Sequence, residues 1–328
     1  MSILDGAIAT GASHYRGLPT PHERVADALH ASGAKVISKG YGRWRLRNGG
    51  LGTGTCDVSL EEEWLTLSKS LTGDSLPAPD LARPLQLLRR NAELPGGVRV
   101  ALVGDCNDLQ LRTDIPCRAL LAHGQDLLAA RVDQALPGFR RAPARSPASN
   151  RDGGRGADPA ATGDDGENDF VSRLLAVCDE AGWRAERGNT DEPRVEVVLG
   201  DGCGIATIMQ AGTGALFRTY LNFTDLPADD GDCARAIGVL LLRAAGHVRM
   251  CRPVLHPRED RPAIQFQVLI GESTMVAAEV DCALGALSVA AKDYMREVEL
   301  LSTDPHLARL YLDTWKKHRS RTPSTRKM

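Results

Sequence analysis

The chain has 328 residues, 42% of them hydrophobic and 25% charged, with a formal net charge of −2 at pH 7. This composition excludes a chain that is disordered throughout, and the charge balance excludes binding of nucleic acid or of an acidic partner through bulk charge alone. The densest apolar run, residues 236–242, is far shorter than the roughly 20 residues that span a bilayer. The first residues lack the basic start of a secretory signal, so we expect a cytoplasmic protein without a membrane partner.

A segment near the middle divides the chain. Residues 141–168 contain no apolar side chain larger than alanine, and such a composition cannot bury enough surface to offset its conformational entropy. We therefore predict a disordered linker there. The predicted parts are an N-terminal tail at 1–19, a first module at 20–140, the linker at 141–168, a second module at 169–301, a C-terminal helix at 302–318 and a basic tail at 319–328.

Each module is predicted to begin with a helix followed by three strands. Apolar residues recur at helical spacing in 23–36 and in 172–185, and a glycine suited to a C-terminal cap follows each apolar stripe, Gly33 in one and Gly182 in the other. Alternating patterns rich in β-branched and aromatic residues then predict the strands. These are 41–47, 55–60 and 62–71 in the first module, and 194–200, 204–210 and 215–223 in the second.

The second half of each module follows a shared pattern as well. A Leu-Pro pair precedes an aspartate, one further residue and Ala-Arg, which predicts a helix capped by Asp80 in one module and by Asp232 in the other. A hairpin and a third helix follow. The hairpins are 96–104 with 107–116 and 246–255 with 263–271, and the helices are 117–136 and 274–301. A last helix is predicted to start at Asp304-Pro305.

The same order of elements thus occurs twice. We predict an α+β protein of two tandem α-β-β-β-α-β-β-α modules, each a mainly antiparallel sheet packed with helices. This order resembles the type III secretion chaperone fold, including its YbjN-like sensory-transduction relatives, and the resemblance covers both modules. It implies a five-stranded sheet in each module, a protein-binding function and the pairing of two copies.

Doubling the fold has a physical consequence. A linker of about 28 residues gives the two modules a high effective concentration, so they can form an intramolecular pseudo-dimer, although a homodimer of the chain is also open. We predict a non-enzymatic, chaperone-like protein that holds a partner polypeptide. The alternative is a regulatory or sensory domain pair whose basic tail contacts nucleic acid.

Aromatic residues make up only 4% of the chain, so the positions of those on predicted strands matter. They could fill the core between helices and sheet, or they could line an apolar groove that takes an extended peptide. Phe217 and Phe223 share one face of their strand, and Tyr220 lies on the other. The candidate partner-binding residues are Trp44, Trp64, Phe217, Tyr220 and Phe223.

No catalytic constellation, metal site or cofactor is predicted. Cys203 lies among glycines in 200–204, but a turn between strands does not lower a thiol pKa as a helix N-terminus does. His247, Cys251 and His256 could ligate a metal ion, yet no fourth ligand is evident. We interpret them as a strand histidine, a buried thiol and a turn histidine.

Overall fold

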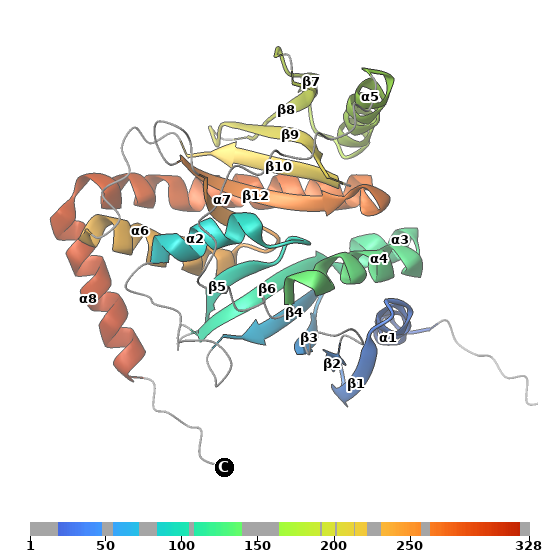
Figure 1. The fold of residues 1–328 in the computed structure, drawn as a ribbon, viewed down its shortest axis with the longest axis horizontal. Helices are drawn as coiled ribbons and strands as arrows, with labels where there is room; N and C mark the ends of the chain where they lie inside the picture. The colour runs from blue at the N-terminus through green and yellow to red at the C-terminus, as the bar shows by residue number, and fades with distance from the viewer. Residues whose placement is uncertain are drawn as a thin grey trace, which may run out of the picture.

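The computed structural model describes residues 19–47, 55–71, 84–104, 108–139, 164–190, 192–200, 202–212, 214–221, 231–256 and 263–321. They form two similar modules (Figure 1). The first module contains α1 (Pro21–Ala31), β1 (Lys35–Gly40), β2 (Arg43–Arg47), β3 (Thr55–Glu61), β4 (Trp64–Ser70), α2 (Pro84–Glu93), β5 (Arg99–Val103), β6 (Asp108–Pro116), α3 (Cys117–His123), α4 (Gln125–Ala135) and a 3-10 turn, η1 (Leu136–Phe139). The second contains α5 (Asp164–Glu180), β7 (Ala185–Arg187), β8 (Arg194–Val198), β9 (Ile205–Ala211), β10 (Gly214–Tyr220), α6 (Asp232–His247), β11 (Arg252–His256), β12 (Ala263–Gly271), η2 (Glu272–Thr274), α7 (Ala277–Thr303) and α8 (Pro305–Arg321).

The two sheets have the same topology. The strand order is β1-β2-β3-β4-β6-β5 in the first and β7-β8-β9-β10-β12-β11 in the second, and neighbouring strands are antiparallel. The predicted α+β class and the mainly antiparallel sheets are therefore confirmed. Each sheet has six strands instead of the five that the resemblance implied.

The additional strand of each sheet lies at its outer edge, directly after the first helix. In the first module, α1 ends at Ala31 and Gly33 turns the backbone at φ 73°, so the predicted helix 23–36 is too long. Residues Lys35–Gly40 leave the helix and pair with β2. In the second module Gly182 has φ 81° and β7 follows. The glycine signals were correct, but the strands behind them carry too little alternation to be recognised.

Three further expectations need correction. The predicted helix 117–136 is broken into α3 and α4 at Gly124, whose φ is 133°. Asp232 is the first residue of α6 rather than its cap, because Gly231 takes the cap position. His247 ends α6 and is not a strand residue, since the helix continues through the stretch that was expected to open the hairpin.

Of two further predicted helix starts, one is confirmed and the other lies outside the described residues. Asp304 does begin the last helix, because its carboxylate accepts hydrogen bonds from the backbone N–H groups of His306 and Leu307 at 2.9 and 3.0 Å. Asp80 lies outside the described residues, and so does most of the predicted linker, although α5 already starts at Asp164.

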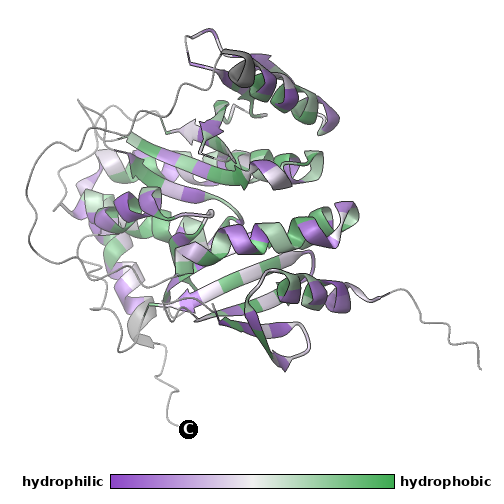
Figure 2. Cartoon of the chain, turned by 45° about the vertical axis from the view of Figure 1, so that its right-hand side comes forward, coloured by the Kyte–Doolittle hydropathy of each residue, from purple (hydrophilic) through white to green (hydrophobic). Residues whose placement is uncertain are grey.

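The core lies between one face of each sheet and the helices. Figure 2 shows the strands striped with hydrophilic and hydrophobic residues in alternation. In β2, for example, Trp44 and Leu46 are buried, while Arg43, Arg45 and Arg47 project to the opposite face. The outer strands of each sheet thus bury one face and leave a second, more polar face, whereas the strands at the junction, β5, β6, β11 and β12, are buried on both faces along most of their length.

The two modules pack on each other through reciprocal contacts. Helix α2 of the first module lies against β11 of the second, and the corresponding helix α6 lies against β5 of the first (Figure 1). Arg99, the first residue of β5, donates a hydrogen bond through Nε to the carbonyl of Ala245 at 2.7 Å. Arg252, the first residue of β11, donates through Nη1 to the carbonyl of Leu94 at 2.7 Å. Each arginine therefore satisfies a carbonyl at the C-terminal end of the other module's helix.

Close backbone packing accompanies these hydrogen bonds. A Cβ atom on Gly246 would lie 2.2 Å from the carbonyl oxygen of Leu102, and one on Gly238 would lie 2.6 Å from Cγ of Pro84. Asn91 of α2 is fully buried and connects both edge strands, since it accepts from the N–H of Val100 at 2.7 Å and donates to the carbonyl of Pro253 at 3.0 Å. The junction is as tightly packed as a domain core.

A buried ion pair joins the modules at a second point. Arg131 of α4 donates through Nε to Glu279 of α7 at 2.9 Å, and through Nη2 to the carbonyl of Leu269 at 3.0 Å. Burial raises the pKa of Glu279, although the Arg131 charge opposes this effect. Because both side chains are almost fully buried, the pair fixes the relative position of α4 and α7.

Candidate functional site

The structure divides the five aromatic candidates between core and surface. Phe217 is fully buried and Trp44 is 3% exposed, so both fill the core and offer no surface to a partner. Trp64 and Tyr220 are partly exposed. Phe223 lies outside the described residues. The tryptophan and the tyrosine are therefore the candidates whose placement fits contact with another molecule.

Trp64 lies where the first sheet meets the second module. The guanidinium of Arg249 stands over its ring, 5.5 Å from the centroid. Arg249 also donates through Nη2 to Glu61 at 3.1 Å and through Nη1 to the hydroxyl of Thr66 at 3.2 Å. These contacts hold the indole against the second module and leave part of it open to solvent.

Arg249 lies beside a buried cluster of charged side chains. Asp114 of β6 is fully buried and pairs with Arg99 and with Arg112, whose Nη2 lies 2.8 Å from its carboxylate. Arg249 lies 3.5 Å from the same carboxylate. Burial alone would raise the pKa of Asp114, but the charges of Arg99 and Arg112 hold it well below its usual range. Asp114 therefore stays ionised and fixes the arginines around it.

An open pocket of about 360 Å³ begins beside Trp64, and we call it the junction pocket. It lies between β4 of the first module and, in the second, the C-terminal end of α6 and the middle of α7. Its lining residues are Trp64, His247, Val248, Arg249, Cys282, Gly285, Ala286, Val289, Asp293 and Tyr294. Small residues of α7 leave space for an inserted side chain, and the aromatic ring and the charged groups surround that space.

Two polar side chains on the rim are neutral near pH 7. The hydroxyl of Tyr294 lies 3.5 Å from Nδ1 of His247. Burial, together with the charges of Arg243 and Arg112, lowers the pKa of His247. Burial and nearby acids raise the pKa of Tyr294. An imidazole and a phenol in these states offer hydrogen bonds without adding charge to the pocket.

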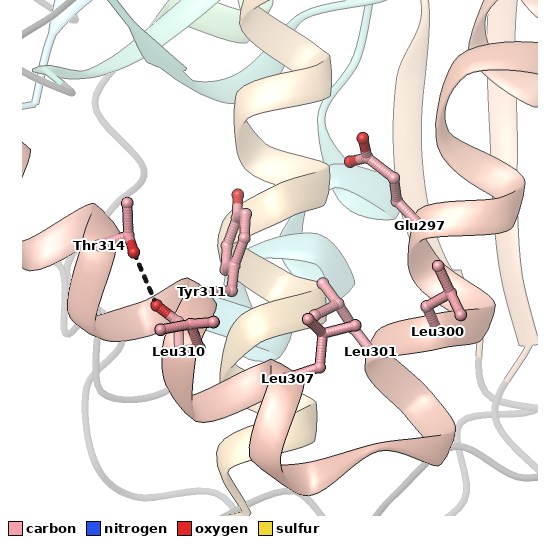
Figure 3. A pocket seen from close by; sticks show the side chains of 7 residues that line it. All are labelled: Glu297, Leu300, Leu301, Leu307, Leu310, Tyr311 and Thr314. Atoms are coloured by element: carbon pink, nitrogen blue, oxygen red, sulfur yellow. Dashed lines mark hydrogen bonds between the residues drawn. The ribbon is translucent and has the colours of Figure 1, made fainter.

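A second open pocket, of about 330 Å³, lies between α7 and α8 (Figure 3). We call it the hairpin pocket. Leu301 of α7 and Leu307 of α8 lie close together near the turn of the two helices, Leu300 lies apart from them on α7, and Tyr311 lies along α8 (Figure 3). Leu310 and Leu300 are 57% and 45% exposed. The pocket is apolar except for Glu297 and Thr314, and the hydroxyl of Thr314 donates to the carbonyl of Leu310 at 2.9 Å.

One side of α7 contributes to both pockets, and we call it the α7 face. Its residues recur at spacings of three or four and are Cys282, Gly285, Ala286, Val289, Asp293, Glu297 and Leu300. Val289 is 47% exposed. At 1.5 Å per residue, Val289 and Leu300 lie about 16 Å apart along the helix. The two pockets are thus within reach of one bound segment.

The sequence analysis predicted a helix at 274–301 and did not identify a binding surface on it. Val280, Leu284 and Leu287 form its buried side. The signal for a second surface was present in residues 282–291, which contain no charged side chain. A helix that is apolar on more than one side is either buried on all of those sides or presents an apolar surface to another molecule.

Tyr220 belongs to a different surface. It lies on the outer face of the second sheet, where the guanidinium of Arg218 stands 5.3 Å from its ring centroid. Val198 and Ile205 are exposed on the same face and pair across β8 and β9. Tyr220 lies on the second sheet and does not line the junction pocket, whereas Trp64 lies on the first sheet and does, so the two are not brought together in one site.

The residues considered for catalysis or metal binding are also separate. Cys203 is buried in the turn between β8 and β9, where its N–H donates to the carbonyl of Gly200 at 3.1 Å. Cys251 is buried, which raises its pKa to about 12, while His256 is exposed at the end of β11. Within the described ranges, no three His, Cys, Asp or Glu side chains are grouped so that they could hold a metal ion.

Comparison with known proteins returns no match, either to a protein family or to a curated protein. In the part of the chain that the structure describes, no helix has the length and apolar character needed to cross a membrane. The geometry of the pockets is therefore the basis for a functional argument.

Proposed function

We propose that this protein is a non-enzymatic, chaperone-like protein that holds a partner polypeptide, with its two modules paired within one chain. The observation that carries the proposal is the α7 face, a single helix side that lines two neighbouring open pockets. The large apolar side chains that the described residues expose are Tyr41, Val198, Ile205, Val289, Leu300 and Leu310. Half of them lie at these two pockets, and such concentration is typical of binding surfaces.

The energetics favour a polypeptide as the occupant. Covering one exposed valine or leucine contributes at most about 1.5–3 kcal/mol, so these three side chains together only offset the lower end of the cost of association. The partner must therefore make further contacts between the two pockets, and a polypeptide segment that reaches both pockets can make them. Two apolar anchors about 16 Å apart correspond to about eleven residues of a helix or about five residues of a strand. Both spans are common in segments that dock into grooves.

The charges on the α7 face indicate the chemistry of this partner. Asp293 and Glu297 lie between the exposed Val289 and Leu300, one turn apart on the same side of the helix. A segment with a lysine or arginine between two apolar anchors would neutralise them. An acidic segment would be repelled, so the proposed partner is an amphipathic segment with a basic centre.

Capture of the partner tests the proposal. The intact protein is immobilised and exposed to cytosol from its own source at moderate salt, and bound polypeptides are identified by mass spectrometry. We expect one polypeptide at near-stoichiometric yield with the wild type, and its loss with Val289→Asp and with Leu310→Asp. The matched control is Val198→Asp, because Val198 is also an exposed valine, 66% exposed, but lies on the second sheet.

The captured polypeptide is then measured in titrations. Val289→Asp on the α7 face and Leu310→Asp on the α8 side of the hairpin pocket should each weaken its affinity about 10- to 100-fold, whereas Val198→Asp should leave it unchanged. Equal capture by the wild type, Val289→Asp and Leu310→Asp would contradict the proposal. A catalytic turnover abolished by a single polar substitution would contradict its non-enzymatic part.

A further inference from the structure

The outer end of the first sheet carries a concentration of positive charge. Arg43, Arg45 and Arg47 alternate with core residues along β2, so all three project to the outer face. Lys35 of β1 is directly opposite Arg47 and projects to the same face, and Lys39 lies at the bulge of the same strand. We call these five residues the basic face.

Most of this charge is not neutralised by acidic residues in the part of the chain that the structure describes. Arg45 pairs with Asp57 of β3 at 2.6 Å. Among the residues that the structure describes, the other four cations have no carboxylate within ion-pair distance. Successive arginines on one side of β2 are separated by about 7 Å, the length of two strand residues. The basic face is therefore a regular row of cations on an open sheet rather than a set of ion pairs.

An exposed aromatic ring stands at the tip of the β1–β2 hairpin, on the side of the sheet where His22 of α1 also stacks on Trp44. Tyr41 forms the tip of the β1–β2 hairpin between Gly40 and Gly42, which both have positive φ angles, and is 87% exposed. One face of its ring stacks on His22, with centroids 4.6 Å apart and the planes 9° from parallel. The stack fixes the orientation of the ring, and its high exposure leaves the other face open to solvent.

We propose that the basic face and Tyr41 together bind single-stranded nucleic acid. The lysines and arginines bind successive phosphates along the strand, and an unpaired base stacks on the free face of Tyr41. A flexible single strand that follows the cations along β2 reaches the ring by passing over the hairpin tip, and its bases are free to stack. Because contacts to phosphates and ring faces are common to all bases, the binding tolerates changes of sequence.

Other polyanions fit this surface less well. A duplex has no unstacked base for Tyr41. An anionic membrane would be bound more strongly through inserted apolar side chains, and Ile37, the apolar member of this face, is partly buried. The basic face lies on the same side of the first sheet as the junction pocket, because Arg43 is opposite Ser59 of β3 and Ser59 is opposite Thr66 of β4. The two surfaces consist of different residues, since the basic face is on β1 and β2 and the junction pocket begins at Trp64 of β4 (Figure 1). The inference goes beyond the proposed function and does not depend on it.

Fluorescence anisotropy with the full-length protein tests the inference. The probes are labelled 20-residue oligo(dT) and oligo(U), with a mixed-sequence duplex of equal length for comparison, at several salt concentrations between 50 and 200 mM. We expect Tyr41→Ala to weaken oligonucleotide binding about 5- to 100-fold and Tyr41→Phe to retain it, because phenylalanine still stacks. Arg43→Ala with Arg47→Ala should reduce the slope of log affinity against log salt by about 1.4, which corresponds to two lost phosphate contacts.

The controls separate this surface from other cations. Arg296→Ala removes an exposed arginine from α7 and should leave affinity and slope nearly unchanged. Removal of residues 322–328 lowers the slope further if the basic tail contributes, but the effect of Tyr41→Ala must remain. Absence of binding at 50 mM salt, or wild-type binding by both Tyr41→Ala and the double arginine variant, would overturn the inference. So would equally tight binding of anionic vesicles or polyglutamate that is lost with the same substitutions, because the ligand would then be a lipid surface or an acidic chain.

Discussion

Replacement of Gly246 by alanine tests how closely the two modules pack. Gly246 lies in the last turn of α6, and its missing side chain allows the helix to approach β5 of the other module. A Cβ atom there would lie 2.2 Å from the carbonyl oxygen of Leu102 and 3.1 Å from its carbonyl carbon. Because both atoms are backbone, α6 would have to move by roughly 1 Å to restore van der Waals contact.

The expected effect is a loss of stability, although alanine favours helices. Overpacking of a tight core costs about 1–3 kcal/mol, and the gain from helix propensity is at most about 1 kcal/mol, and less near a helix end. The matched control is Gly285→Ala in α7, where a Cβ atom meets nothing within 4 Å. That substitution should stabilise the protein by about 0.5–1 kcal/mol, because it gains propensity without a clash.

Urea unfolding followed by circular dichroism measures both effects. For a slope of about 3 kcal/mol/M, Gly246→Ala should lower the midpoint by up to about 1 M, and Gly285→Ala should raise it by about 0.2–0.3 M. If Gly246→Ala unfolds at or above the wild-type midpoint while Gly285→Ala behaves as expected, α6 and β5 do not approach each other as described. The reasoning about the junction would then be wrong.

Three further substitutions and treatments probe separate features. Asp114→Asn should cost about 3–5 kcal/mol in urea unfolding, because it leaves Arg99 charged and buried. The folded-state pKa of Asp114 is lowered, so its stabilisation is complete above the unfolded pKa of about 3.9 and is lost as pH falls below it, and this loss should be smaller in Asp114→Asn. Burial raises the pKa of Cys282 to about 11, so iodoacetamide at pH 7.5 should label it slowly but ahead of the fully buried Cys251, and bound partner should protect it, as peptide mapping would show. Asp304→Ala removes the N-cap of α8 and should cost about 1 kcal/mol of thermal or urea stability.

Much of the fold could be predicted because local patterns agree with it. Glycines after the first helices, the Asp304-Pro305 start of α8 and the alternation along β2 each reflect a steric or hydrogen-bonding requirement of the backbone. The repeated order of such signals was sufficient to predict the two modules. These features depend on residues that are close together in the sequence, so a local sequence pattern is enough to predict them.

The missing features depend on contacts between distant segments. Strand β1 has two lysines and a terminal glycine in six residues, so it forms only because β2 supplies its hydrogen-bond partners. His247 is helical because α6 packs along β5 of the other module. Sequence patterns do not specify such partners.

The candidate site shows the same limit. Trp64 was identified as an aromatic residue on a strand, but its orientation at the surface depends on contact with Arg249, which is distant in sequence. Trp44 and Phe217 have the same residue class and the same strand context, yet both are buried. Aromatic type alone therefore could not separate core from surface, and the packing of the modules decides between them.

The two modules are similar where they contact each other and differ on their exposed surfaces. Arg99 and Arg252 occupy equivalent positions and make equivalent contacts, whereas the strand equivalent to β2 carries Arg194, Glu196 and Val198 and has no row of cations. The long α7 has no counterpart in the first module, where two short helices take its place. A pair of identical modules would have to present both surfaces twice, while two diverged modules can each specialise.

This division predicts that the two surfaces act independently. A variant that combines Arg47→Ala with Val289→Asp should lose nucleic-acid affinity only through the first change and polypeptide capture only through the second. The changes lie in different modules without shared contacts, so their effects should add within about 0.5 kcal/mol. A larger coupling would mean that the ligands meet on the molecule or that the junction transmits binding from one module to the other.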